Sequence, residues 1–291
     1  MKKTVPIPIY ISHLKQEGKK ASTIYQYEKL LLKLQKIHSF PITCLSYGEI
    51  IRFLESIGGR GIWRNTATII LKEFYKWLVN QGYRKDNPLE FLKVQHQRTR
   101  EYPVFTSQEF IRILNASKPK VRDLLLHLRW TGLRISEALN SRKSDFMLDR
   151  VDNYGNAAPE MLVRGKGGTN IYIPLLNPTH VSWLKKRLFS KQSQERLFPM
   201  SYQQAWYGIH KAADRAGVQR MLYNEYDQPR FYITPHSIRR FFATWALQKG
   251  FDITMVQKLL RHKDINTTLR YAKVSNDMIR DRLQKLMVNN G

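Results

Sequence analysis

Cysteine is nearly absent from this sequence, since Cys44 is the only one among 291 residues. A single thiol excludes an intramolecular disulfide and any metal site built from several cysteines, and it predicts a reducing, cytoplasmic location. Long apolar runs are absent too. The basic start, residues 1–20, is not followed by the apolar stretch of a signal peptide, and no segment reaches membrane-spanning length.

Acidic residues are also scarce. Lys and Arg number 49 against 23 Asp and Glu, which gives a formal net charge of +26. Such an excess predicts a polyanionic partner, for which nucleic acid is the usual candidate. Residues 1–100 contain 18 basic and 7 acidic side chains, and the remainder contains 31 and 16. A basic tail is therefore excluded, and both halves of the chain are expected to contact nucleic acid.

Helical periodicity dominates the rest of the pattern, and the length suffices for two domains with separate cores. Residues 1–93 predict a compact helical domain, with a helix that Ser22 caps and that runs to His38, and helices from Ser46 to Ile57 and from Arg64 to Asn80. The inward residues expected there are Tyr27, Leu30, Leu31, Leu34, Ile37, Ile69, Ile70, Phe74, Trp77 and Leu78. Any basic four-helix bundle would show the same pattern. Residues 94–104 are polar, basic and non-periodic, which predicts an interdomain linker.

Residues 105–291 predict a second, mainly helical domain with a small β-hairpin. Thr106 or Ser107 caps a first helix, residues 121–130 form a leucine-rich second one, and Gly132 interrupts it. Met161–Val163 and Ile171–Leu175 read as two strands joined by a glycine-rich turn with Lys166 at its tip. Residues 201–216 predict a further amphipathic helix.

The stretch 234–273 contains the residues that indicate chemistry. Thr234 and Pro235 start a helix whose apolar stripe consists of Ile238, Phe241, Phe242 and Trp245. On a helical wheel His236, Arg239 and Arg240 fall opposite that stripe. A helix over residues 254–261 places His262 at its end, and a third helix start precedes Tyr271. Two histidines, an arginine and a tyrosine near helix ends suit a site that handles phosphate.

Each of these residues also has an ordinary explanation. Tyr271 could be a packing residue, and His262 could pair with a helix dipole. Arg239 and Arg240 could form a solvated face, and Arg134 could form an ion pair with Glu137. Lys166 could be a solvated lysine of the hairpin. Only the order and spacing of the whole set favour a functional interpretation.

That order resembles the tyrosine recombinases, the phage integrase family. The pattern His236-x-x-Arg239, then Leu260-Arg261-His262, then Tyr271 nine residues on, is similar to the family's C-terminal signature. TGLRISEAL, residues 131–139, resembles its first motif with Arg134 as the arginine, and VRGKGG, residues 163–168, followed by IYIPL resembles its lysine hairpin. The resemblance covers about residues 106–273. The chain departs from it at Arg261, where the family usually has glycine, and at Lys273, where it often has histidine.

The resemblance implies an N-terminal core-binding domain and a C-terminal catalytic domain. It implies a site-specific recombinase that cleaves and rejoins double-stranded DNA through a covalent 3′-phosphotyrosine intermediate, as a tetramer on paired sites and without metal, ATP or another cofactor. Arg134 and Arg239 would bind the phosphate, Tyr271 would be the nucleophile, His236 or His262 would assist, and Lys166 would protonate the leaving 5′ oxygen. The candidate DNA contacts are Lys93, Arg98, Arg100 and Arg240.

Three alternatives remain beside this interpretation: a type IB topoisomerase-like enzyme, a metal nuclease, for which a compact carboxylate–histidine cluster is lacking, and an inactive DNA-binding accessory protein. The biological roles of integration, cointegrate resolution and chromosome-dimer resolution also stay open, although the two-domain form favours Xer-like or resolvase types. The tail, residues 277–288, predicts a helix with the apolar stripe Ile279, Leu283, Leu286 and Met287. That stripe packs either on its own domain or on a neighbouring protomer.

Overall fold

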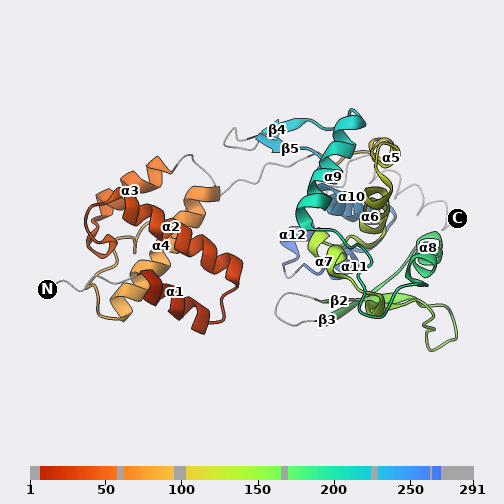
Figure 1. Ribbon diagram of the computed structural model, residues 1–291, viewed down its shortest axis with the longest axis horizontal. Coiled ribbons are helices and arrows are strands. Elements are labelled where there is room, and N and C mark those ends of the chain that lie inside the picture. The colour runs from red at the N-terminus through yellow and green to blue at the C-terminus, as the bar shows by residue number, and fades with distance from the viewer. Residues whose placement is uncertain are drawn as a thin grey trace, which may run out of the picture. The chain divides into compact units, whose positions relative to one another are not determined.

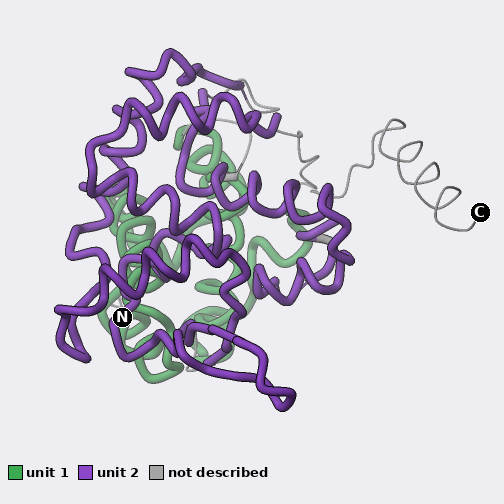
Figure 2. The backbone as a smooth tube through the Cα atoms, turned by 90° about the vertical axis from the view of Figure 1, so that its right-hand side faces the viewer, with its two compact units in different colours: residues 1–100, 224–228 green, residues 101–223, 229–291 purple. Residues whose placement is uncertain are grey.

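The computed structural model describes residues 7–57, 62–94, 103–164, 170–223, 229–262 and 264–269. The chain divides into two compact units, residues 1–100 with 224–228 and residues 101–223 with 229–291 (Figures 1 and 2). Both units are mainly helical, as the sequence predicts. No helix in the described part is long and apolar enough to cross a membrane.

The first unit is a small helical bundle. Its elements are α1 (Ile7–Gln16), α2 (Ala21–Ile37), the short 3-10 helix η1 (Ile42–Cys44), α3 (Tyr47–Ser56) and α4 (Ile62–Asn80). The helix α3 is found where the sequence predicts one, and the Ser46 side chain caps it while Glu49 closes the capping box. Leu31, Leu34 and Phe74 lie in the core, and the ring of Tyr10 packs edge-on against Phe74 with centroids 5.1 Å apart.

Two local predictions in this unit are wrong. Ser22 does not cap α2, because the helix already begins at Ala21 and Lys20 stands at the cap position without a side-chain bond. Ile37 and Ile69 do not face the core, and they are 54% and 47% exposed. Ile69 lies about 100° around the helix from Ile70, on the side away from the buried Leu71, so it falls outside the face that packs in the core.

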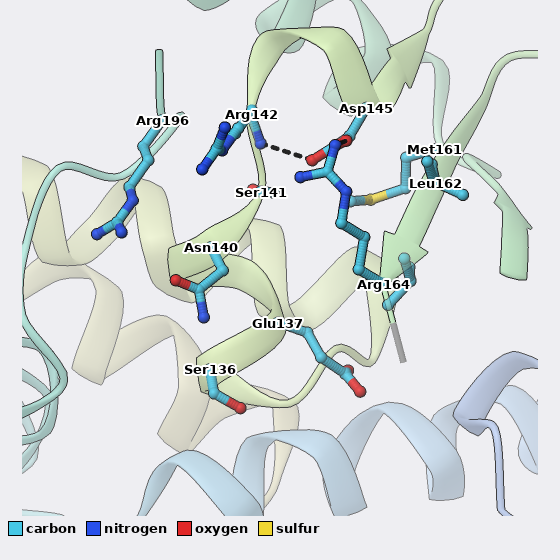
Figure 3. A pocket seen from close by; sticks show the side chains of 11 residues that line it. Ser136, Glu137, Asn140, Ser141, Arg142, Asp145, Met161, Leu162, Arg164 and Arg196 are labelled. Atoms are coloured by element: carbon cyan, nitrogen blue, oxygen red, sulfur yellow. Dashed lines mark hydrogen bonds and ion pairs between the residues drawn. The ribbon is translucent and has the colours of Figure 1, made fainter. Parts of the chain in front are cut away.

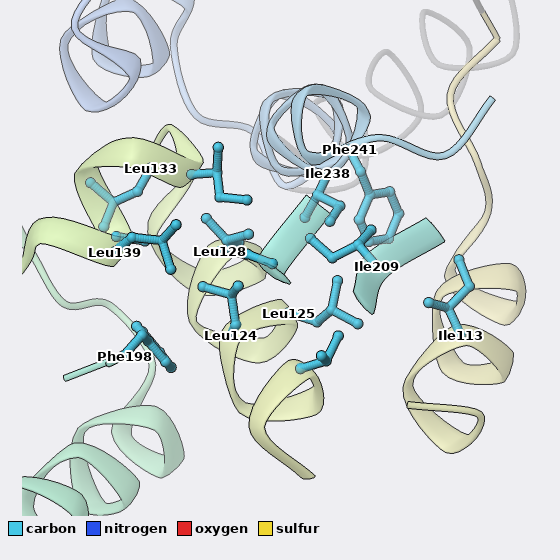
Figure 4. Close-up of a cluster of buried hydrophobic side chains, with 14 of the residues drawn as sticks. Ile113, Leu124, Leu125, Leu128, Leu133, Leu139, Phe198, Ile209, Ile238 and Phe241 are labelled. Carbon is cyan, nitrogen blue, oxygen red and sulfur yellow. The ribbon is translucent and has the colours of Figure 1, made fainter. Parts of the chain in front are cut away.

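The second unit surrounds one leucine-rich helix. Its helices are α5 (Ser107–Asn115), α6 (Pro119–Thr131), α7 (Ile135–Asn140), the 3-10 helix η2 (Lys143–Asp145), α8 (Pro178–Leu188), α9 (Tyr202–Arg215), α10 (Pro235–Gln248), α11 (Ile253–Leu260) and α12 (Asn266–Leu269). Leu124, Leu125 and Leu128 of α6 meet Ile209 of α9 and Ile238 of α10 in the core (Figure 4). The helix α10 packs on α6 and also on α11.

Two small antiparallel sheets complete this unit. The first has the order β1 (Phe146–Met147), β2 (Glu160–Arg164) and β3 (Asn170–Pro174), and it pairs Met161 with Ile173 and Val163 with Ile171. The predicted hairpin is therefore confirmed, but its turn with Lys166 lies outside the described residues. The second sheet pairs β4 (Met221–Tyr223) with β5 (Pro229–Phe231), which the sequence did not predict.

Candidate active site

The first element of the site is the turn between α6 and α7. Gly132 closes α6 with a left-handed backbone (φ 60°), which a residue with a side chain adopts at a cost. Two residues later Arg134 stands at the cap position of α7. Its backbone N–H and its Nη1 both donate to the carboxylate of Glu137, at 2.7 and 2.8 Å. The Arg134 side chain is nevertheless 48% exposed, so its remaining donors can meet a ligand.

The second element is α10, which carries Arg239 in its interior. Thr234 caps α10 as predicted. The Arg239 guanidinium donates from Nη1 to the carbonyl of Gly132 at 2.8 Å and from Nη2 to the carbonyl of Leu260. Arg239 is only 2% exposed, which rules out the alternative of a solvated face. The reason is that α10 is covered by α6 on one side and α11 on another, whereas the helical wheel assumed one packed face.

The third element is the end of α11, where His262 follows the helix. Arg261 closes α11 with a left-handed backbone (φ 55°, ψ 45°). The backbone N–H of His262 donates to the carbonyl of Gln257 at 3.1 Å, and its Nδ1 lies 2.9 Å from the hydroxyl of Thr268. These bonds hold the imidazole at the junction of α11 and α12.

The two histidines are neutral near pH 7. Desolvation by the surrounding protein, then the cations of Arg240, Arg239 and Arg134, lowers the pKa of His236 to about 4, although His236 itself keeps an exposed surface. Burial, then Arg239 and Arg134, lowers the pKa of His262 to about 4 as well. Arg134 and Arg239 therefore act on both rings, so the structure brings these four predicted residues into one electrostatic neighbourhood. An anion bound among them would raise both pKa values.

Glu137 lies at the centre of this neighbourhood. Its Oε2 accepts from Arg261 Nη2 at 2.7 Å and lies 3.9 Å from Nη1 of Arg239. Burial raises the pKa of this carboxyl, but Arg261 and Arg134 outweigh burial, so the pKa falls below its usual range. Three arginines thus surround one carboxylate, and a net positive charge remains for a ligand. The sequence indicated Glu137 only as an ion-pair partner of Arg134, and it gave no sign that Arg261 or Arg239 would reach it.

A pocket of about 240 Å³ adjoins the site beside α7 and β2 (Figure 3). Arg142, Arg164 and Arg196 line it, together with Asn140 and Ser136. Arg164 pairs with Asp145 at 2.5 Å, and Arg142 Nη1 donates to Gln194 at 2.5 Å. These arginines come from separate segments of the sequence, and only Arg164 lies within a motif that the sequence indicated, the lysine hairpin.

Several predicted residues cannot be placed. Lys166, Tyr271, Arg98 and Arg100 lie outside the described residues, as does the tail over 277–288. Lys93 is exposed, and Arg240 is half-buried on α10. Within the ranges that the structure describes, no three His, Cys, Asp or Glu side chains group so that they could hold a metal ion.

The fold and the arginine–histidine cluster agree with the class that the motifs indicate. Residues 103–278 match the model of the Phage integrase family, and the chain belongs to this family. More specifically, it is a tyrosine recombinase. It is 28% identical to the tyrosine recombinase XerA of Thermococcus onnurineus over 97% of this chain and 95% of that protein. It is 30% identical to the tyrosine recombinase XerD of Neisseria meningitidis serogroup A over 70% of both chains.

Solved structures support the same fold. A lambda integrase fragment (75–356), crystallised as a dimer bound to a COC′ core site, superposes with a TM-score of 0.68. The superposition covers 93% of this chain and 96% of the fragment, at 18% sequence identity.

Proposed function

We propose that this chain cleaves and rejoins double-stranded DNA at specific sites, with Tyr271 as the nucleophile of a covalent 3′-phosphotyrosine intermediate. One observation carries the proposal: Arg239 of α10 donates to the carbonyls of Gly132, two residues before Arg134, and of Leu260, two residues before His262. Arg134 and Arg239 also act on the pKa of both His236 and His262, so the four residues form one positively charged neighbourhood suited to an anion. A scissile phosphate is the anion that a tyrosine recombinase must bind.

The two arginines stabilise charge on the phosphate. A phosphodiester gains negative charge on its oxygens in the transition state, and donors fixed in advance stabilise that charge without reorganising. Arg239 fits this role because its guanidinium is already oriented by the carbonyls of Gly132 and Leu260. Arg134 presents an exposed guanidinium from the cap of α7, where it can bind phosphate oxygens through its fork.

Protons move through the remaining groups. The Tyr271 oxygen attacks phosphorus and loses its proton, while the bond between phosphorus and the 5′ oxygen breaks. A neutral imidazole, His236 or His262, can accept the proton from the phenol, and Lys166 can donate one to the departing 5′ oxygen. The phosphodiester energy is kept in the new bond, so the 5′ hydroxyl of another strand can attack it without ATP.

The charge of the chain supports DNA as the partner. The net charge of +26 favours a long polyanion, and the pocket with Arg142, Arg164 and Arg196 lies beside the site where flanking phosphates would run. We assign phosphate contacts also to Lys93, Arg98, Arg100 and Arg240. Recombination joins two sites, so we propose a tetramer on paired DNA, acting in the cytoplasm. The lambda integrase fragment described above is a dimer on its core site.

The test starts from trapping. Genomic DNA fragments are incubated with the protein, and those that stay covalently attached are sequenced to define a substrate. On that substrate, Tyr271→Phe is expected to keep its DNA affinity and to form no protein–DNA adduct, because the substitution removes only the attacking hydroxyl. Tyr207→Phe, at an exposed tyrosine of α9, is the matched control and should form the adduct normally. An undiminished adduct with Tyr271→Phe would move the nucleophile elsewhere.

A further inference from the structure

Arg261 has an unusual backbone conformation. It is the one residue other than glycine with positive φ in the described part of the chain, at φ 55°. A left-handed conformation costs a residue with a Cβ atom conformational energy that glycine does not lose. Such strain persists only where surrounding interactions over-determine it, and it concentrates at functional sites.

The Arg261 side chain is buried and bonded on both sides. It is 5% exposed, donates from Nη2 to Glu137 at 2.7 Å, and donates from Nη1 to the carbonyl of Leu259 at 2.7 Å. Burial lowers the pKa of Arg261, although Glu137 opposes this shift. Arg261 therefore combines a strained backbone with a desolvated cation. The ion pair with the Glu137 carboxylate is the interaction that offsets these costs. A glycine in this position would avoid both costs.

Glu137 links Arg261 to the phosphate-binding arginines. The oxygen that Arg261 binds is the same Oε2 that accepts the backbone N–H of Arg134, at 2.7 Å, and that faces Arg239 at 3.9 Å. Without Arg261, this carboxylate would be offset by Arg134 and Arg239 alone, and their pull on a phosphate would weaken. With Arg261, the carboxylate has a cation of its own on the protein side.

We propose that Arg261 is a positioning residue for strand cleavage. It holds Glu137 and offsets its charge, so that Arg134 and Arg239 present undiminished positive charge to the scissile phosphate. This inference rests on the proposed function. The benefit falls mainly on the transition state, because a phosphodiester gains negative charge there and matched cations stabilise it more than the ground state. The competing explanation is a purely structural link between α11 and α7.

Three substitutions separate strain, charge and function. Arg261→Ala keeps the left-handed strain and removes the guanidinium, whereas Arg261→Gly removes both. We expect Arg261→Gly to melt about 2–4 °C higher than Arg261→Ala. Both should cleave about tenfold more slowly than wild type at saturating DNA, with DNA affinity changed less than about twofold. Arg261→Lys keeps a cation without the fork and should recover part of the rate. If Arg261 were only a structural link, the cleavage rates of the three variants would rise and fall with their melting temperatures.

Coupling to Glu137 is the sharper test. If Arg261 acts through Glu137, then adding Arg261→Gly to Glu137→Gln should slow cleavage by less than about twofold beyond Glu137→Gln itself. If the two substitutions slowed cleavage independently, so that their rate losses multiplied in the double variant, the role assigned to Arg261 would be overturned. Cleavage by Arg261→Gly at the wild-type rate would overturn it too, and both results would leave the proposed function intact. A wild-type protein that forms no adduct on any trapped DNA would instead overturn the proposed function, and this role with it.

Discussion

At the scale of single residues, the two arginines that we propose bind phosphate are held in different ways. Arg239 is 2% exposed and donates to two backbone carbonyls, so its position is fixed before DNA arrives. Arg134 is 48% exposed and is anchored by one carboxylate, so its free donors can adjust to a ligand. Substitution of Arg239 would therefore change folding and chemistry together, whereas substitution of Arg134 reports on chemistry alone.

Arg134→Lys should thus slow cleavage without harming the fold. The lysine keeps the charge but loses the planar fork, and the loss of one oriented donor in such sites costs on the order of 10²-fold in rate. Because the side chain is half exposed, stability should change by less than about 0.5 kcal/mol. Single-turnover cleavage and urea denaturation measure the two effects.

Arg187→Lys, at an exposed arginine of α8 paired with Asp123, is the matched control and should cleave normally. Cleavage by Arg134→Lys at the rate of this control would contradict a bidentate role for Arg134.

The geometry of the site was only partly predictable. The order and spacing of the whole set, and its resemblance to the motifs of the family, indicated Arg134, His236, Arg239 and His262. The burial of Arg239 was not predictable, since its partners Gly132 and Leu260 are 107 and 21 residues away. The same holds for the contact of Arg261 with Glu137, which spans 124 residues. Contacts of this kind depend on how helices pack, which no local pattern records.

At the scale of elements, the site depends on how closely α6 approaches α10. A Cβ atom added to Gly132 would lie 2.3 Å from Cδ1 of Phe242, so the end of α6 lies in direct contact with the ring of Phe242 on α10. The same glycine turns the chain toward Arg134 and supplies the carbonyl that Arg239 binds. This tight contact therefore holds the end of α6, two residues before Arg134, against the helix that carries Arg239.

Gly132→Ala should for this reason destabilise the protein by about 2–4 kcal/mol, because the left-handed backbone and the clash with a buried ring add together. Gly217→Ala is the matched control. It has a similar φ of 63° at the end of α9 but meets nothing within 4 Å, and it should cost only about 1 kcal/mol. Urea denaturation of both variants measures the difference. Equal losses would mean that Phe242 moves aside and that the contact does not hold the end of α6 against α10.

Elements with strong local signals were predicted well. The helix caps at Thr106 and Thr234 and the β2–β3 hairpin are found where the sequence indicated them. The sheet of β4 and β5 was missed, because its strands have three residues each and are largely exposed, so alternation of apolar residues is absent. Short strands take their stability from their neighbours more than from their own residues.

At the scale of the whole molecule, the basic charge is divided between two units that each have their own core. Many phosphate contacts then share the binding free energy, so affinity for one DNA site should tolerate the loss of any single contact. Recombination makes a further demand, since it needs several protomers to act on paired sites. We therefore expect contacts between protomers to control the reaction, and the predicted apolar tail packs either on its own domain or on such a contact.

Truncation after Ser275 tests that role. The removed residues include Ile279, Leu283, Leu286 and Met287, and burial of about four such side chains contributes several kcal/mol to a protein–protein contact. If the tail docks on a neighbouring protomer, the truncated protein should bind a single site with nearly unchanged affinity. It should lose cooperative binding to paired sites and most of its recombination, measured by gel shift and by product formation. Misfolding of the isolated truncated protein would indicate packing on its own unit instead, and normal recombination would contradict both interpretations of the tail.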